Sequence, residues 1–530
     1  MWGRDKKQLI RLAALAALGI LSACGGGGGG GGGVAGSSAS GWVTGVFAPA
    51  ANFAAQCAAP RSGIDPSSGA PFRDVQGSSL SENNWLRSWT NDLYLWYDEV
   101  VDRDPASYST PDYFDLLKTG FSTPSGSPKD RFHFTMDTAE WVSFSQSGVS
   151  AGYGVEWALV ARTPPRRIVV AYTEANSPAT AAGLTRGFEV MRVDGVDAVS
   201  DNSRAGIDTL NAGLFPAASG ETHTFTVRDL AGFWHDVTMQ SANVTSTPVQ
   251  NVATIATSSG PVGYMLFNDH IATAESELID AVNTLKAGSV TDLVLDIRYN
   301  GGGYLAIASE LAFMIAGSAR TSGRTFEQVV FNRKHPTFDP VTGEVLAPLP
   351  FLSTAQDLSA PSGQPLPSLN LSRVFVLTGP GTCSASEGII NSLRGVGVQV
   401  IQIGSTTCGK PYGFYPEDNC GTTYFSIQFK SVNAAGFGDY TDGFAPGNTV
   451  GGFGTPVPGC SVADDFTHAL GDPAEGRLAA ALGYRNTSSC PAPSGFAPPS
   501  LRLSVQGTMI SPADGLKSKS PWREIRILRR

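Results

Sequence analysis

The sequence lacks several features that would assign it to a simple class. Beyond the first 23 residues it has no apolar run long enough to cross a bilayer. Its 37 Lys and Arg against 46 Asp and Glu give a formal charge of −9, which gives no reason to expect nucleic-acid binding. It has no Cys-x-x-Cys pair and no clustered histidines, so we expect no metal site and no other cofactor.

What it does contain is enough apolar material for several folded domains. Of its 530 residues, 42% are apolar and 16% are charged, which excludes a disordered chain. Strands and helices are both expected, so the predicted fold class is mixed α/β. Residues 325–372 are rich in proline and are predicted to be a surface insertion.

The first 23 residues form an export signal, with a basic start and a short apolar run, Leu12 to Leu21. Its end, Leu21-Ser22-Ala23-Cys24, resembles a bacterial lipobox, which implies cleavage before Cys24 and a lipid on its sulfur. An ordinary signal peptide with a chance cysteine is the alternative. Nine glycines follow, Gly25 to Gly33, and suit a flexible tether. We therefore favour a lipid anchor in the bacterial cell envelope, with the outer membrane preferred because Gly25 offers no acidic retention signal.

Without Cys24, six cysteines remain, and an even number in an exported chain indicates disulfides. Six cysteines allow 15 pairings. Proximity in sequence favours Cys408 with Cys420 and Cys460 with Cys490.

The most informative stretch is residues 374–410. An apolar strand, 374–378, leads through small residues to Ser384, and a helix is predicted over about 385–393. A second strand, 398–403, leads to Lys410, which lies 26 positions after Ser384. A strand–helix–strand unit returns the chain to the same edge of a sheet, so these two side chains can meet.

Two tetrapeptides here, Ser384-Ala385-Ser386-Glu387 and Thr407-Cys408-Gly409-Lys410, resemble the signatures of the carboxyl-terminal processing (tail-specific) serine peptidases. The resemblance implies Ser384 as nucleophile and Lys410 as its base. Burial of a lysine in apolar surroundings lowers its pKa from about 10.4, and tuned lysines of about 7–8 act as bases. Many family members place a glutamine four residues after the lysine; Phe414 stands here, so the residue that orients Lys410 is open, with Tyr412 only a guess.

A glycine turn upstream extends the resemblance. The strand 292–298 ends in Asn300-Gly301-Gly302-Gly303, and in the family such a turn supplies an oxyanion N–H. By position we choose the Gly302 N–H, with the Ala385 N–H as second donor. Asp296 and Arg298 are expected to brace the turn. A phosphate loop is a poor alternative because no Gly-Lys-Ser/Thr follows.

Residues 149–245 resemble a PDZ domain, with Gly152, Tyr153, Gly154 and Val155 in the position of its carboxylate-binding loop. A PDZ domain adds an extended peptide to a sheet edge, so the domain is expected either to hold substrate C-terminal tails or to serve as a hinge or lid.

Together these features predict the following layout: signal peptide 1–23, lipidated tether 24–78, N-terminal helical region 79–148, PDZ-like domain 149–245, α/β catalytic domain 246–490 and weakly ordered tail 491–530. The implied function is a serine endopeptidase acting on exported proteins with exposed C-terminal tails. The alternatives are a catalytically silent PDZ-containing lipoprotein that binds partner C-termini, and a Ser-His-Asp enzyme, for which His270 is the only histidine near the expected strands.

Overall fold

The computed structural model describes residues 42–66, 68–491, 516 and 526–527. The predicted signal peptide, Cys24 and its glycine run, and most of the predicted tail lie outside the described residues. Within the part that is described, no helix has both the length and the apolar character needed to cross a membrane.

A six-stranded sheet forms the centre of the predicted α/β domain, residues 246–490. Its strand order is β12 (Val249–Ile255), β13 (Val262–Phe267), β14 (Asp292–Asp296), β18 (Arg373–Thr378), β19 (Gln399–Gly404) and β26 (Gly459–Ser461). All neighbours from β13 to β26 run parallel, and only β12 is antiparallel. Every residue of β13 and β14 is buried, as expected for parallel strands that are covered on both faces.

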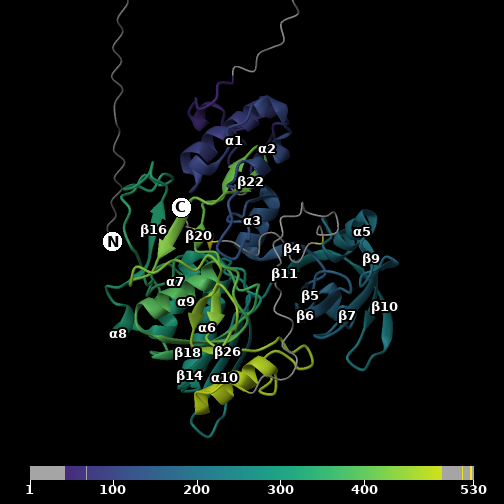
Figure 1. The fold of residues 1–530 in the computed structure, drawn as a ribbon, viewed down its shortest axis with the longest axis vertical. Helices are drawn as coiled ribbons and strands as arrows, with labels where there is room; N and C mark the ends of the chain where they lie inside the picture. The colour runs from purple at the N-terminus through teal and green to yellow at the C-terminus, as the bar shows by residue number, and fades with distance from the viewer. Residues whose placement is uncertain (1–41, 67, 492–515, 517–525, 528–530) are drawn as a thin grey trace, which may run out of the picture. The chain divides into compact units, whose positions relative to one another are not determined.

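Helices cover both faces of this sheet (Figure 1). On one face α6 (Ala274–Ala287), α7 (Leu305–Ala316) and α9 (Ala385–Gly395) pack against alternate strand residues such as Met265 and Val376. On the other face α10 (Gly476–Thr487) packs against the intervening residues, such as Tyr264 and Phe375. The predicted strand–helix–strand unit around Ser384 is β18–α9–β19, and the mixed α/β class is confirmed.

The N-terminal helical region contains α1 (Ser79–Leu93), α2 (Thr110–Leu116) and α3 (Thr138–Ser147), as well as β3 (Phe134–Asp137). Trp85 and Trp89, one turn apart on α1, stack with ring centroids 5.3 Å apart. Their side chains and those of α2 form one buried cluster. The helical spacing of these aromatic residues thus places them on one buried face.

Residues 149–245 form a second sheet in the order β10 (Trp234–Gln240), β9 (Thr222–Arg228), β7 (Glu189–Val193), β6 (Arg167–Thr173) and β5 (Val155–Ala161), with β8 (Val196–Asp197) paired to β7. α4 (Pro178–Ala181) and α5 (Arg204–Leu214) accompany it. A separate pair joins β4 (Val149–Gly152) to β11 (Ala242–Thr245).

The predicted surface insertion at 325–372 is only partly at the surface. It contains β16 (Thr325–Phe331), which pairs with β17 (Leu349–Pro350) and β23 (Phe429–Val432), and β23 also pairs with β20 (Tyr412–Gly413). Phe326, Phe331 and Phe351 belong to the main core. The prediction failed because it relied on the proline content of the segment and gave too little weight to the apolar residues of β16.

The smaller pairings are β1 (Gln56–Cys57) with β2 (Val75–Gln76), β22 (Thr422–Phe425) with β3 and with β21 (Glu417–Asn419), and β24 (Phe444–Pro446) with β25 (Thr455–Val457). Two described pieces of the tail are in contact with the folded chain. Leu516 is buried in the apolar cluster of residues 149–245, and β27 (Arg526–Ile527) pairs in parallel with β15 (Gly303–Tyr304).

A buried carboxyl pair in the α/β domain gives the protein a specific pH dependence. Burial, and the neighbouring Glu275 carboxylate, raise the pKa of Glu310 to about 9. Glu275 in turn accepts backbone N–H groups from Ser359 and Ala360, each at 2.7 Å. Glu310 is therefore protonated in the folded protein at neutral pH, where the unfolded chain would ionise it.

Since the folded pKa is raised, stability is greatest below the ordinary glutamate pKa and is lost as the pH rises toward about 9. We expect Glu310 to remove about 1.4 kcal/mol of unfolding free energy per pH unit across this window. Glu310→Gln should abolish this slope and raise stability at pH 8. Urea unfolding at pH 5, 7 and 8.5 measures this, and equal slopes in variant and wild type would contradict the assignment.

Candidate active site

Ser384 occupies the turn between β18 and α9, and its backbone is unusual. It is the residue immediately before α9, with φ 61° and ψ −114°, and it is fully buried. A non-glycine residue in this region carries strain of about 1–3 kcal/mol, and such strain concentrates at functional sites. Directly after it, the Ser386 N–H donates to the Cys383 carbonyl oxygen at 3.1 Å, whereas the Ala385 N–H stands at the start of the helix, a position suited to receiving an anion.

Lys410 follows β19 in a turn that requires glycine. Gly409 has φ 84°, and a Cβ at this position would lie 2.4 Å from the Thr441 carbonyl oxygen. The Lys410 side chain is fully buried, as its apolar neighbours in sequence predict. Its Nζ lies 4.6 Å from the ring centroid of Phe414 and 4.8 Å from that of Phe132. Tyr412, by contrast, packs edge-on against Trp96 at 4.7 Å.

Glu387, at the start of α9, forms hydrogen bonds with both the Ser384 turn and the Lys410 turn. Its Oε2 accepts the backbone N–H of Ser384 at 3.0 Å and that of Lys410 at 2.8 Å. Its Oε1 accepts the Gly409 N–H at 2.8 Å and the Thr407 hydroxyl at 2.5 Å. Burial raises the pKa of Glu387, and these four donors act in the opposite direction. One carboxylate oxygen therefore holds Ser384 and Lys410, 26 positions apart in the chain, as close neighbours.

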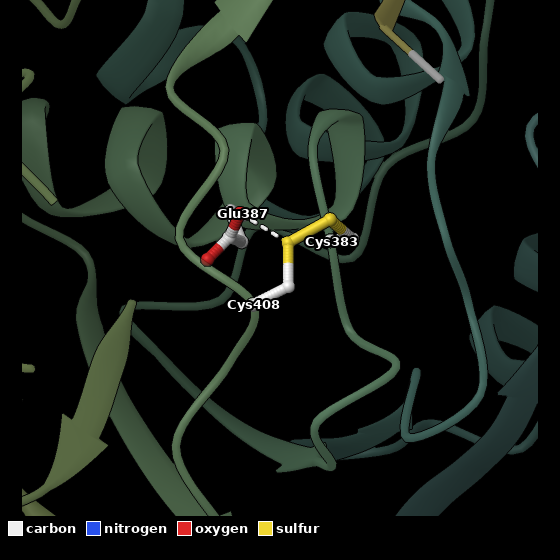
Figure 2. Close-up of side chains that lie close together, drawn as sticks. All are labelled: Cys383, Glu387 and Cys408. Atoms are coloured by element: carbon white, nitrogen blue, oxygen red, sulfur yellow. Dashed lines mark hydrogen bonds between the residues drawn. A yellow bond between two sulfur atoms is a disulfide. The ribbon is translucent and has the colours of Figure 1, made fainter. Parts of the chain in front are cut away.

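A disulfide joins the same two turns (Figure 2). Cys383, just before Ser384, is bonded to Cys408, two residues before Lys410, with their Cα atoms 5.1 Å apart. The Glu387 carboxylate approaches the Cys408 Sγ at 3.4 Å, but a disulfide sulfur has no hydrogen to donate. Cys383, Glu387 and Cys408 together offer three possible metal-ligand atoms within 4.8 Å, yet the sulfurs are bonded to each other and the carboxylate is engaged.

The predicted pairing of Cys408 with Cys420 is therefore wrong. Cys420 is bonded instead to Cys57, across 363 positions, while the predicted pair Cys460–Cys490 is present. Proximity in sequence failed at Cys408 because the fold brings closer partners from distant segments. The bond also leaves Cys383, which adjoins Ser384, without a thiol that could act as a nucleophile.

The glycine turn contacts the serine turn through Asn300. The Asn300 carbonyl oxygen accepts the Cys383 N–H at 3.1 Å and the Ser386 hydroxyl at 3.1 Å. Its side-chain oxygen accepts the Gly302 N–H at 2.9 Å, so this N–H, our sequence choice as an oxyanion donor, is engaged within the turn. Glycine is required at Gly303, where a Cβ would lie 2.3 Å from the His270 carbonyl oxygen.

His270 braces this turn. Its Nδ1 lies 2.9 Å from the Asn300 side-chain oxygen, and because an amide oxygen can only accept, Nδ1 carries the hydrogen and donates it. Burial lowers the pKa of His270 to about 3, and the ring is therefore neutral at ordinary pH. These contacts give His270 a place in the glycine turn rather than in a Ser-His-Asp triad.

Arg298 anchors the other side of the glycine turn in a buried ion network. Its guanidinium lies 2.9 Å from Asp296, 2.8 Å from Glu475 and 2.7 Å from Asp464. Burial acts to raise the pKa of Asp464, but Arg477, Arg298 and Arg186 outweigh it and hold the pKa well below its usual range. Asp296 and Arg298 thus brace the turn, as their position in the sequence predicts.

The predicted peptide-binding loop precedes an edge strand of the second sheet. Gly154 has φ 68°, and a Cβ there would lie 2.4 Å from the Ser177 Cβ, so glycine is needed at this point of the loop. Tyr153 is buried in the domain's core. Val155 begins β5, which stands at the end of the strand order, where an added strand can pair.

Comparison with known proteins agrees with this architecture. Residues 261–413 match the sequence profile of peptidase family S41, a span that runs from the start of β13 to β20 and includes both Ser384 and Lys410. A carboxyl-terminal-processing protease of a Picosynechococcus strain is 26% identical over 241 residues, which is 44% of this chain. That alignment covers 48% of the relative, so the chain spans about half the length of this curated protein.

A crystal structure described as that of a "Putative S41 protease" from Bacteroides fragilis has a TM-score of 0.56 at 21% identity, covering 76% of this chain and 97% of that one. This level of likeness establishes a shared fold. Separately, the match of residues 261–413 to peptidase family S41 agrees with the family that the two tetrapeptides indicated.

Three features of the site were missed from the sequence. Ser384 precedes α9 and Glu387 follows it by three residues, which is the spacing of a capping box. This spacing could have indicated the bond from the Ser384 N–H to the Glu387 carboxylate. The Cys383–Cys408 disulfide and the contact of Phe132 with the Lys410 amine join segments that no local pattern connects.

Proposed function

We propose that this protein is a serine endopeptidase in which Ser384 is the nucleophile and Lys410 its general base. The observation that carries the proposal is the shared Glu387 oxygen, which holds the backbones of both residues in one buried site. The match of residues 261–413 to peptidase family S41 supports the reaction class, and the strained backbone of Ser384 is typical of a nucleophile on a strand-to-helix turn.

In the proposed reaction, Lys410 Nζ removes the Ser384 hydroxyl proton while Ser384 Oγ attacks the carbonyl carbon of the scissile peptide. The developing oxyanion is received by the Ala385 N–H, with the Gly302 N–H as second donor once it turns from Asn300. Collapse of the tetrahedral intermediate expels the amine, which takes the proton from Lys410. Water, deprotonated by Lys410, then attacks the carbonyl carbon of the acyl-serine ester. The C–Oγ bond breaks, Ser384 Oγ takes the proton back from Lys410, and the carboxylic acid product is released.

Two features of the surroundings of Lys410 act on different protonation states of its amine. Complete burial favours an uncharged amine, which is the form a base requires. The aromatic faces of Phe414 and Phe132 attract an ammonium, so they stabilise the protonated form that appears after proton transfer. Phe414 thereby occupies the place where the resembled family carries an orienting glutamine.

Substrate selection is assigned to residues 149–245 as a PDZ-like domain. An extended C-terminal tail would pair with β5, with its carboxylate at the N–H groups of Gly152, Tyr153, Gly154 and Val155. The position of β5 at the end of the strand order among the described residues supports this arrangement. Amidation of the substrate's C-terminus should then raise KM, and an unchanged KM would favour a hinge or lid role.

We also propose that the mature chain is tethered to the bacterial cell envelope, with the outer membrane preferred, by a lipid on Cys24. The lipobox-like end of the signal sequence and the nine glycines after Cys24 support this. The mass of the mature N-terminal peptide, with or without the acyl groups, tests the anchor.

The function is tested by incubating the purified protein with an unstructured polypeptide. Wild type should cut it, and Ser384→Ala should lower kcat by at least about 10³-fold, because the nucleophile is lost. Ser392→Ala, which changes another buried serine of α9, is the matched control and should retain activity. Equal cleavage by Ser384→Ala and wild type would contradict the proposal. Absence of cleavage in both would favour the silent binding protein.

A further inference from the structure

Among the disulfides of the described residues, Cys383–Cys408 lies closest in the sequence to the proposed catalytic pair. One sulfur belongs to the residue before Ser384 and the other to a residue two positions before Lys410. Cys383 is fully buried in the main core, while Cys408 is partly exposed. The other two disulfides, Cys57–Cys420 and Cys460–Cys490, join neither turn.

The two turns differ in how they are otherwise held. Ser384 is fixed by α9 and by the bonds of Asn300 to its neighbours. The segment that carries Lys410 lies between β19, which ends at Gly404, and β20, which begins at Tyr412, so it has no sheet pairing of its own. The Cys408 N–H donates to the Thr382 carbonyl oxygen at 2.9 Å, and Glu387 accepts the next two N–H groups.

We infer that the Cys383–Cys408 disulfide is a positioning device that fixes the Lys410 turn against the Ser384 turn. The expected effect of the disulfide on catalysis rests on the proposed function. Its expected effect on the mobility of the Lys410 turn does not depend on that function. Proton transfer between two side chains is sensitive to small displacements, and a shift of about 1 Å can lower a rate by about 10²-fold. The 405–411 segment is otherwise held by hydrogen bonds, among them Ser405 N–H to the Thr378 carbonyl and Thr407 N–H to the Phe444 carbonyl, each at 3.0 Å, and hydrogen bonds can lengthen where a covalent bond cannot.

The same bond makes the site sensitive to reductants. A dithiol reductant would attack as a thiolate at the partly exposed Cys408 Sγ, breaking the S–S bond and forming a mixed disulfide. The Cys383 sulfur leaves as a thiolate and takes up a proton. The second thiol of the reductant then closes its own disulfide, and Cys408 is released as a thiol. Two electrons pass to the protein, and the turns are then joined only by hydrogen bonds.

The chain offers a matched control for the loss of a disulfide. Cys383 and Cys408 are 25 positions apart, and Cys460 and Cys490 are 30 positions apart. The constraint that a disulfide places on the unfolded chain grows only with the logarithm of the loop length. Each bond therefore restricts the unfolded chain to nearly the same degree, and its loss should cost nearly the same free energy of unfolding. The two bonds differ mainly in which segments of the folded chain they hold together.

The experiment compares Cys383→Ala/Cys408→Ala with Cys460→Ala/Cys490→Ala, by amide hydrogen exchange and by cleavage kinetics. The first variant should exchange the Gly409 and Lys410 amides at least about 10-fold faster. It should also lose about 10²-fold in kcat with KM nearly unchanged. The control variant should match wild type in both. Unchanged exchange at Gly409 and Lys410, or equal kcat in the two variants, would overturn the inference.

The two readouts separate this inference from the proposed function. If wild type cleaves nothing, the peptidase proposal fails, and the exchange data still decide whether the disulfide holds the turn. If the first variant does not fold, wild type is reduced stepwise with dithiothreitol, and peptide mapping identifies the opened bond. Loss of kcat should then follow opening of Cys383–Cys408, and loss that follows Cys460–Cys490 instead would contradict the inference.

Discussion

Replacing Lys410 with methionine should abolish peptide hydrolysis while leaving the fold intact. Methionine is similar in length and can pack between the rings of Phe132 and Phe414, which contact the amine in the wild-type protein. It cannot accept a proton from Ser384. Since general bases contribute about 10²–10⁴-fold to rate, we expect kcat to fall by about 10³-fold or more.

Lys430→Met is the control for this change. Lys430 lies on β23, and its side chain is exposed, so its loss should leave kcat within about twofold of wild type. Unfolding curves for both variants would show whether the fold is retained. Normal turnover by Lys410→Met would remove Lys410 from the mechanism and leave Ser384 without a base among the groups described here.

Replacing Glu387 with glutamine should damage both activity and stability. Two carboxylate oxygens accept four donors here, and an amide would replace one of these oxygens with an NH₂ group that faces two donors. Leaving a buried donor unpaired costs about 1–3 kcal/mol. We expect a loss of about 3 kcal/mol in the free energy of unfolding, and a fall in kcat of about 10²-fold as the two turns separate.

Glu344→Gln, which alters an exposed glutamate in the same domain, provides the comparison. Stability is measured by urea unfolding and activity by cleavage of the same unstructured polypeptide. A Glu387→Gln protein with wild-type kcat would mean that the carboxylate supports the fold but does not position the two turns.

The arrangement around Ser384 could be predicted from the sequence because its signals are local. Apolar strands on either side of an amphipathic helix specify a parallel β18–α9–β19 unit, and that topology alone returns Lys410 to the edge that carries Ser384. The glycine turn was predictable for the same reason, since Gly302 has φ 102° and the close backbone approach at Gly303 requires a residue without a Cβ.

The parts that could not be predicted depend on contacts between distant segments. Cys57 pairs with Cys420 across 363 positions, and Phe132 reaches the Lys410 amine from the N-terminal helical region. Neither partner carries a local pattern that identifies the other. The burial of β16 was missed for a related reason, because its apolar residues acquire their meaning only from β23, about 100 positions later.

The most direct test of the central claim is to identify the residue that becomes acylated during turnover. The reaction with an ester substrate is quenched in acid, and the peptides are mapped by mass spectrometry. We predict an acyl group on Ser384, absent when Lys410 is methionine. An acyl group on any other residue, or an equal amount on Ser384 without Lys410, would contradict the account.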